Sequence, residues 1–187
     1  MHPPAQTPPL DVDGFSMGVL HCQDPKTGEE HFIYSTSGSV AEAEERCRLM
    51  APHLPANYVI ANPVLHPSYW SGRQDPRFIP GRNPDGSLYA GDSTACAEPR
   101  ILQCARDRGW TVRGMTIAWN GSSPNPLPDL KNNPDGQYMR RCPSCEANAN
   151  SLMAGVPEPA KTRWHVVLFL LLIGIVCMVI AALRGKL

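Results

Sequence analysis

Four residues of this chain have the types and spacing needed to build a reactive metal site. Cys96 and Glu98 lie two residues apart, and Cys142 and Cys145 form a C-x-x-C pair further along the chain. Thiolates are common zinc ligands, and three protein ligands leave the fourth tetrahedral position open for water, as in catalytic zinc sites. The sequence therefore predicts one Zn²⁺ on the three cysteines, with Glu98 beside it as an acid and base.

Both halves of this pattern are predicted to lie at the N-terminal ends of helices. The first helix is expected over residues 95–108 and the second over residues 142–153. Residues three apart share one helix face, so Cys142 and Cys145 can reach the same ion. Helix N-termini also favour thiolates, because their free N–H groups and positive dipole ends face the sulfur atoms.

Arginines close to these motifs are expected to support the site. Arg100 and Arg141 lie near the ligands in sequence, and we predict that they donate hydrogen bonds to the sulfur atoms. The stretch 62–93, rich in Pro and Gly, precedes the first motif and shows no periodic pattern. Long irregular loops in compact domains are often functional, so the candidate substrate contacts within it are Tyr69, Trp70, Arg73, Arg77 and Arg82.

The remaining pattern predicts an α/β domain in which strands and helices alternate, with a mixed sheet between layers of helices. Ser39 followed by Glu42 has the spacing of a capping box and marks the start of the first helix. In chain order, the predicted elements are strands over 15–22 and 29–36, a helix over 40–50, a strand over 58–61, a helix over 95–108, a strand over 110–119 and a helix over 142–153.

The C-terminal part of the chain has the composition of a membrane anchor. Residues 164–183 carry no formal charge, and 20 apolar residues can cross the hydrocarbon core as a helix. We therefore expect a single-pass anchor with the domain on the cytosolic side. The predicted organisation is a disordered arm (1–13), the zinc domain (14–153), a linker (154–163), the transmembrane helix and a short basic tail (184–187).

Charge and cysteine content narrow the classes of function. The 17 basic and 17 acidic side chains balance, so the composition gives no sign of a domain-wide basic face for long nucleic acids. Seven cysteines are present, but the first residues have no apolar stretch of the signal-peptide kind. Metal binding is thus the preferred interpretation of the C-x-x-C pair over a disulfide framework.

At these motifs the chain resembles the cytidine-deaminase-like superfamily. Cys96-Ala97-Glu98 and Cys142-Pro143-Ser144-Cys145 match its C-A-E and C-x-x-C motifs, and the order of elements agrees with its fold. The opening hairpin and the continuation to Pro99 are similar to the compact deaminase domains of bacterial polymorphic toxins. The resemblance implies a three-layer α-β-α sandwich, zinc on the three cysteines, Glu98 as proton shuttle and a toxin-like role with an immunity protein as partner.

Candidate substrate contacts follow partly from the same resemblance. Family members often have a substrate-binding Asn about a dozen residues before the first ligand; Asn83 is our candidate and Asn62 the alternative. Ala97 lies within the motif itself, and Trp119 could stack on a base or serve as a core aromatic. One departure concerns Arg141, which stands where the family usually has Pro before the first Cys of C-x-x-C.

These observations lead to one main hypothesis and two alternatives. The main one is a zinc-dependent hydrolytic deaminase acting on a nucleobase, cytosine rather than adenine, in a nucleotide or in single-stranded nucleic acid. The first alternative is a catalytically inactive zinc-binding module that serves as a membrane-tethered interaction domain. The second is an enzyme for an amidine or guanidine that is not a nucleobase.

Overall fold

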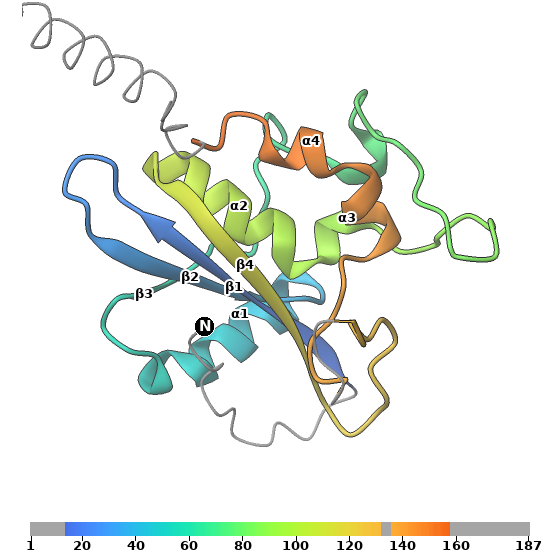
Figure 1. The fold of residues 1–187 in the computed structure, drawn as a ribbon, viewed down its shortest axis with the longest axis horizontal. Coiled ribbons are helices and arrows are strands. Elements are labelled where there is room, and N and C mark those ends of the chain that lie inside the picture. Colours follow the sequence, from blue (N-terminus) through green and yellow to red (C-terminus); the bar gives the residue numbers. More distant parts are fainter. Residues whose placement is uncertain (1–13, 132–135, 158–187) are drawn as a thin grey trace, which may run out of the picture.

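The computed structural model describes residues 14–131 and 136–157, which form a four-stranded mixed sheet with helices (Figure 1). The sheet order is β3-β2-β1-β4; β1 is antiparallel to both β2 and β4, whereas β3 is parallel to β2. The elements are β1 (Phe15–Gln23), β2 (Glu30–Thr36), α1 (Val40–Met50), β3 (Tyr58–Ile60), α2 (Ala97–Arg108), β4 (Thr111–Asn120), α3 (Pro143–Ala147) and α4 (Ala149–Met153). The predicted α/β class and mixed sheet are confirmed.

Helices cover both faces of the sheet because side chains alternate along each strand. Leu20 of β1 belongs to a large hydrophobic cluster that includes Ile101 of α2. Met17 of the same strand belongs to a separate cluster that includes Cys47 and Met50 of α1. Thus α2, which carries the first motif, packs on the sheet face opposite to α1 (Figure 1).

Capping residues mark the start of α1 and the end of α2. Ser39 caps α1 in a complete capping box, since its side chain accepts from the Glu42 N–H and the Glu42 side chain accepts from the Ser39 N–H. Gly109 ends α2 in the left-handed conformation with φ of 68°, which glycine adopts without steric cost. Cys96 is the N-cap residue of α2, with extended backbone dihedrals.

The helix predicted over residues 142–153 is two short helices, α3 and α4, and the single-helix prediction is wrong. Asn148 separates them, with φ of −106° and ψ of 14°. Its amide is buried and bonds to both backbone groups of Ile79, at 2.7 Å from the N–H and 2.8 Å to the carbonyl. The side chain therefore uses the helix break to tie α3 and α4 to the irregular loop.

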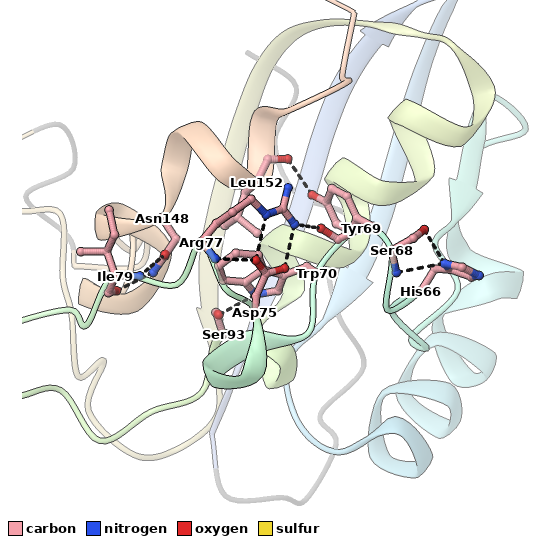
Figure 2. Close-up of polar contacts among 10 residues, drawn as sticks. All are labelled: His66, Ser68, Tyr69, Trp70, Asp75, Arg77, Ile79, Ser93, Asn148 and Leu152. Atoms are coloured by element: carbon pink, nitrogen blue, oxygen red, sulfur yellow. Dashed lines mark hydrogen bonds and ion pairs between the residues drawn. The ribbon is translucent and has the colours of Figure 1, made fainter.

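The long loop between β3 and α2 is irregular, as predicted, but it is anchored by polar contacts (Figure 2). The Tyr69 hydroxyl donates to the Leu152 carbonyl of α4 at 2.7 Å, and the Trp70 indole N–H donates to Ser93 Oγ at 2.8 Å. Both aromatic side chains are 1% exposed and lie in the large hydrophobic cluster. They are core residues that hold the loop in place.

The predicted membrane anchor lies outside the described residues, as do the predicted arm, most of the linker and the basic tail. Within residues 14–131 and 136–157, no helix has the length and apolar character needed to cross a bilayer.

Candidate metal centre

The fold brings the three predicted ligands together. The Sγ atoms of Cys96, Cys142 and Cys145 all lie within 4.8 Å of one another, and the Cys96 and Cys142 sulfurs are 3.6 Å apart. Three sulfurs on a tetrahedral zinc, with bonds of about 2.3 Å, would be separated by about 3.8 Å. The donor atoms and their spacing therefore fit one zinc ion, and the three cysteines can hold a metal.

The Cys96 side of the site is fixed by contacts between the start of α2 and the turn after β2. The Gly38 N–H donates to the Ala95 carbonyl at 2.8 Å. Arg100, one turn into α2, donates to the carbonyls of Thr36 and Gly38, each at 2.7 Å. The predicted hydrogen bonds from Arg100 to sulfur do not appear among its contacts. Its guanidinium positions the helix start instead, and burial lowers its pKa.

The other side of the site is the first turn of α3. Cys142 is the N-cap residue of this helix, and its sulfur accepts the Cys145 N–H at 3.3 Å. Pro143 occupies the first helical position, where its missing N–H costs nothing. Gly81 lies directly against the Pro143 backbone, so closely that an added Cβ would lie 2.4 Å from the Pro143 carbonyl. The loop before α2 therefore packs against the ligands of α3.

The sulfur atoms share their protons unequally. Hydrogen bonds from the Cys145 and Cys96 thiols lower the pKa of Cys142, and backbone N–H groups assist. The pKa values of Cys96 and Cys145 rise, because donation to the Cys142 sulfur and burial favour their protonated forms. Because zinc binds thiolates, metal binding to these cysteines would release the protons that their sulfurs carry.

Glu98 lies beside the three sulfurs and is only 3% exposed. Burial raises the pKa of its carboxyl to about 7, although the nearby Arg141 charge opposes this rise. Glu98 Oε1 and Arg141 Nε are 2.9 Å apart, but the geometry is that of an ion pair without a hydrogen bond. Arg141, predicted to donate to sulfur, thus faces the carboxylate. A carboxyl with this pKa can take up and return a proton near neutral pH.

The three cysteine ligands and Glu98 line one cavity of about 40 Å³. This volume has room for roughly three water molecules. Four lining residues were not among the predicted site residues, namely Ser16, Ile117, Met139 and Arg140. Only strand alternation offered a signal, since Ser16 shares a face of β1 with Gly18, against which Ala97 packs. The lining residues are Ser16, Cys96, Ala97, Glu98, Ile117, Met139, Arg140, Arg141, Cys142 and Cys145.

Of the predicted substrate contacts, Ala97 lines this cavity and the others do not. The Asn83 amide donates to Ser87 Oγ at 3.0 Å, within a tight turn of the loop. The Asn62 side chain accepts the Val64 N–H at 2.9 Å. The Trp119 indole N–H donates to the Ser123 carbonyl at 2.7 Å. All three side chains make these contacts outside the cavity wall.

A larger groove of about 370 Å³ lies at the start of α1, but it is a poorer site for chemistry. Its walls are mostly apolar, with Trp70 and Leu65 among them, and none of the three sulfurs contributes. Arg100 is its one ionisable lining residue, and that guanidinium already holds two carbonyls. The small cavity is therefore the better candidate for a functional site, although the groove is larger.

Comparisons of this chain with protein-family models, with curated proteins and with solved structures found no match.

Proposed function

We propose that this chain is a zinc-dependent hydrolytic deaminase that acts on a nucleobase, with cytosine favoured over adenine. The observation that carries the proposal is the shared cavity, in which three cysteine sulfurs and the buried Glu98 carboxylate lie side by side. Three sulfurs leave room for a fourth ligand on the metal, and a carboxylate next to that position has the acid and base role.

The bound ion would supply Lewis acidity, which lowers the pKa of a coordinated water. The carboxylate of Glu98 would accept a proton from the attacking water and pass it to the ring nitrogen. It would then take the proton of the hydroxyl group added at C4 and deliver it to the departing amine. Its pKa of about 7 suits both directions of transfer at neutral pH. Hydroxide would add to C4 of cytosine, the bond between C4 and the amino nitrogen would break, and the products would be ammonia and uracil.

Two further features support a deaminase of the cytidine-deaminase-like type. Helices on both faces of a mixed sheet agree with the three-layer α-β-α arrangement that the motif resemblance implies. The C-A-E and C-x-x-C motifs each supply residues to the same cavity. The toxin-like role, the immunity partner and the membrane anchor rest on the sequence alone and remain part of the proposal.

Ammonia release from zinc-loaded protein tests the proposal directly. The substrates are cytidine, adenosine, their monophosphates, and single-stranded DNA and RNA, each with wild type and with Glu98→Gln. We expect turnover on a cytosine substrate and a loss of roughly 10²–10⁴-fold in Glu98→Gln, with the zinc content unchanged. Glu44→Gln, on the exposed side of α1, is the matched control. Equal rates for wild type and Glu98→Gln would remove the carboxylate from the mechanism.

One observation favours a second function, a zinc-binding module without catalysis. The cavity is too small for a base while Arg141 faces Glu98. The substrate panel separates the two functions, because an inactive module would bind one zinc per chain and release no ammonia from any substrate.

A further inference from the structure

Arg141 occupies the place that a substrate would need. Its Nε lies 2.9 Å from Glu98 Oε1, and both side chains line the cavity. Glu98 is 4% exposed at the side chain, whereas Arg141 is 36% exposed, so the cation is at the mouth and the anion is inside. In the described part of the chain, this ion pair is the only polar side-chain contact of Arg141. A single contact holds the guanidinium over the carboxylate.

A base can reach Glu98 only if this guanidinium moves. The cavity of about 40 Å³ accepts a few water molecules, and a pyrimidine ring with its substituents is several times larger than one water. Moving Arg141 away leaves a buried carboxylate without its counter-charge, which is costly. A substrate that offers the guanidinium a new anion removes most of that cost, and a neutral nucleoside offers none.

A second cation stands beside the first. Arg140 also lines the cavity, is exposed, and its side chain has no hydrogen bond or ion pair within residues 14–131 and 136–157. Its backbone is held, since the Arg140 N–H donates to the Leu127 carbonyl at 3.0 Å. Two adjacent guanidinium groups on a fixed backbone, one of them free, suit a phosphate, which accepts paired N–H donors.

We infer that the substrate of this site carries a phosphate, which binds Arg140 and draws Arg141 away from Glu98. This inference rests on the proposed deaminase function and narrows its substrate to a phosphorylated pyrimidine. The phosphate belongs either to a free nucleotide or to a nucleic-acid strand. In both cases Arg141 keeps the carboxylate covered until a phosphate arrives, so free bases and nucleosides are excluded.

Binding of reaction products tests the inference without turnover. Zinc-loaded protein is titrated calorimetrically with uridine, uridine monophosphate and a short single-stranded oligonucleotide that contains one uracil. We expect the phosphorylated ligands to bind roughly 10- to 100-fold more tightly than uridine, the range for hydrogen bonds to charged groups. Tighter binding of the oligonucleotide than of the monophosphate assigns the phosphate to a strand, and the reverse order assigns it to a nucleotide. Equal affinities for uridine and both phosphorylated ligands would overturn the inference.

Variants distinguish displacement of Arg141 from a general effect of removing positive charge. Arg141→Ala is expected to lower the affinity for uridine monophosphate, because it removes a phosphate contact. The affinity for uridine should stay unchanged or rise, because the guanidinium no longer covers Glu98. Arg140→Ala should weaken only the phosphorylated ligands. Arg48→Ala, on α1 at the opposite face of the sheet, is the charge control and should change neither. Parallel losses for uridine and its monophosphate in Arg141→Ala contradict the covering role.

A spectroscopic measurement separates failure of this inference from failure of the proposed function. The side-chain N–H signal of Arg141, assigned by its absence in Arg141→Lys, is followed by NMR during titration with uridine monophosphate. A shift of this signal shows displacement of the guanidinium even if no substrate in the panel releases ammonia. An unshifted signal together with ammonia release from cytidine would leave the deaminase standing and would sink the phosphate inference.

Discussion

The two halves of the candidate site are held by different kinds of contact. The half that carries Cys96 and Glu98 is fixed by a buried cation, since the Arg100 guanidinium donates to two carbonyls of the turn after β2. The half that carries Cys142 and Cys145 is fixed by neutral contacts with the irregular loop. The first half is therefore tied to the turn after β2 by a charged group, whereas the second, although Cys145 lies in the same core cluster, is tied to the loop by uncharged groups.

Because of this difference, we expect changes in one half to lower mainly the stability of the domain and changes in the other to lower mainly its metal affinity. Hydrogen bonds from a buried charged group contribute more than neutral ones, and their loss leaves carbonyls without donors. Disruption of the Arg100 half should therefore destabilise the whole domain. Disruption of the α3 half should shift two of the three ligands while most of the sheet and α2 remain folded. Each prediction below tests one side of this contrast.

The largest effect is expected from Arg100→Met, which keeps an unbranched apolar stem and removes all five donors. The carbonyls of Thr36 and Gly38 would lose their partners in a site where Arg100 is 1% exposed. We expect the free energy of unfolding to fall by about 3 kcal/mol, the sum of two charge-assisted hydrogen bonds at the lower end of their range. Urea unfolding of the metal-free protein measures this value.

Arg100→Lys and Arg48→Met are the companions of that variant. A lysine can replace one of the two hydrogen bonds, so it should recover part of the loss. Arg48 is 68% exposed at the side chain and pairs with the exposed Glu45, so its replacement should change stability by no more than about 0.5 kcal/mol. A loss in Arg100→Met no larger than in Arg48→Met would show that the buried cation does not fix this half.

Gly81→Ala is expected to have an intermediate effect on stability and a larger effect on zinc affinity. The new Cβ would lie 2.4 Å from both the carbonyl carbon and the oxygen of Pro143, so backbone must shift. We expect zinc affinity to fall by at least about 10-fold, as for changes that displace metal ligands. The free energy of unfolding of the metal-free protein should fall by about 1–3 kcal/mol. Competition with a chromophoric chelator measures the affinity.

Gly114→Ala is the control for that substitution. Gly114 lies on β4, and no heavy atom lies within 4 Å of a Cβ added there. Zinc affinity should equal that of wild type. If Gly81→Ala and Gly114→Ala retain zinc equally well, the loop does not position the first turn of α3.

The same contrast decides what could be predicted from the sequence. Strands β1, β2 and β4 and helices α1 and α2 followed from periodicity and capping residues, because these signals are local. Cys142 and Cys145 followed from their spacing, since a helix start places i and i+3 residues together, and Cys96 followed from the paired C-A-E and C-x-x-C motifs. These predictions concern elements whose form depends on neighbouring residues in the chain.

Features that depend on distant contacts could not be predicted. The Asn148 break exists because a side-chain amide finds the backbone of Ile79, 69 residues away. The Arg141 contact with Glu98 depends on the path of the segment before α3, which pairs with the edge of β4 through Met139. Trp70 looked like a ligand-binding aromatic because its loop has no periodicity, yet tertiary packing buries it.

The smallest effect concerns a charge pair on the loop side, in which the Asp75 carboxylate is buried and the Arg77 side chain is 43% exposed. Asp75 accepts from Arg77 at 2.8 Å and 2.7 Å, and these contacts lower the pKa of the Asp75 carboxyl to about 2, from an ordinary value of 3.8. A carboxyl whose folded-state pKa is lowered contributes stability above its unfolded pKa, and that contribution is lost as the pH falls through the folded value. The loss is at most about 2 kcal/mol and falls between about pH 4 and pH 2.

Asp75→Asn should remove this pH dependence, because an amide does not titrate in that window. Urea unfolding of metal-free protein at several pH values compares the slopes of wild type, Asp75→Asn and Asp107→Asn, whose side chain is 52% exposed. Metal-free protein is needed because acid also protonates the thiolate ligands. Asp107→Asn should follow wild type. If the free energy of unfolding of Asp75→Asn depends on pH as steeply as that of wild type, the acid sensitivity comes from other groups. The charge pair on the loop side would then contribute little to stability.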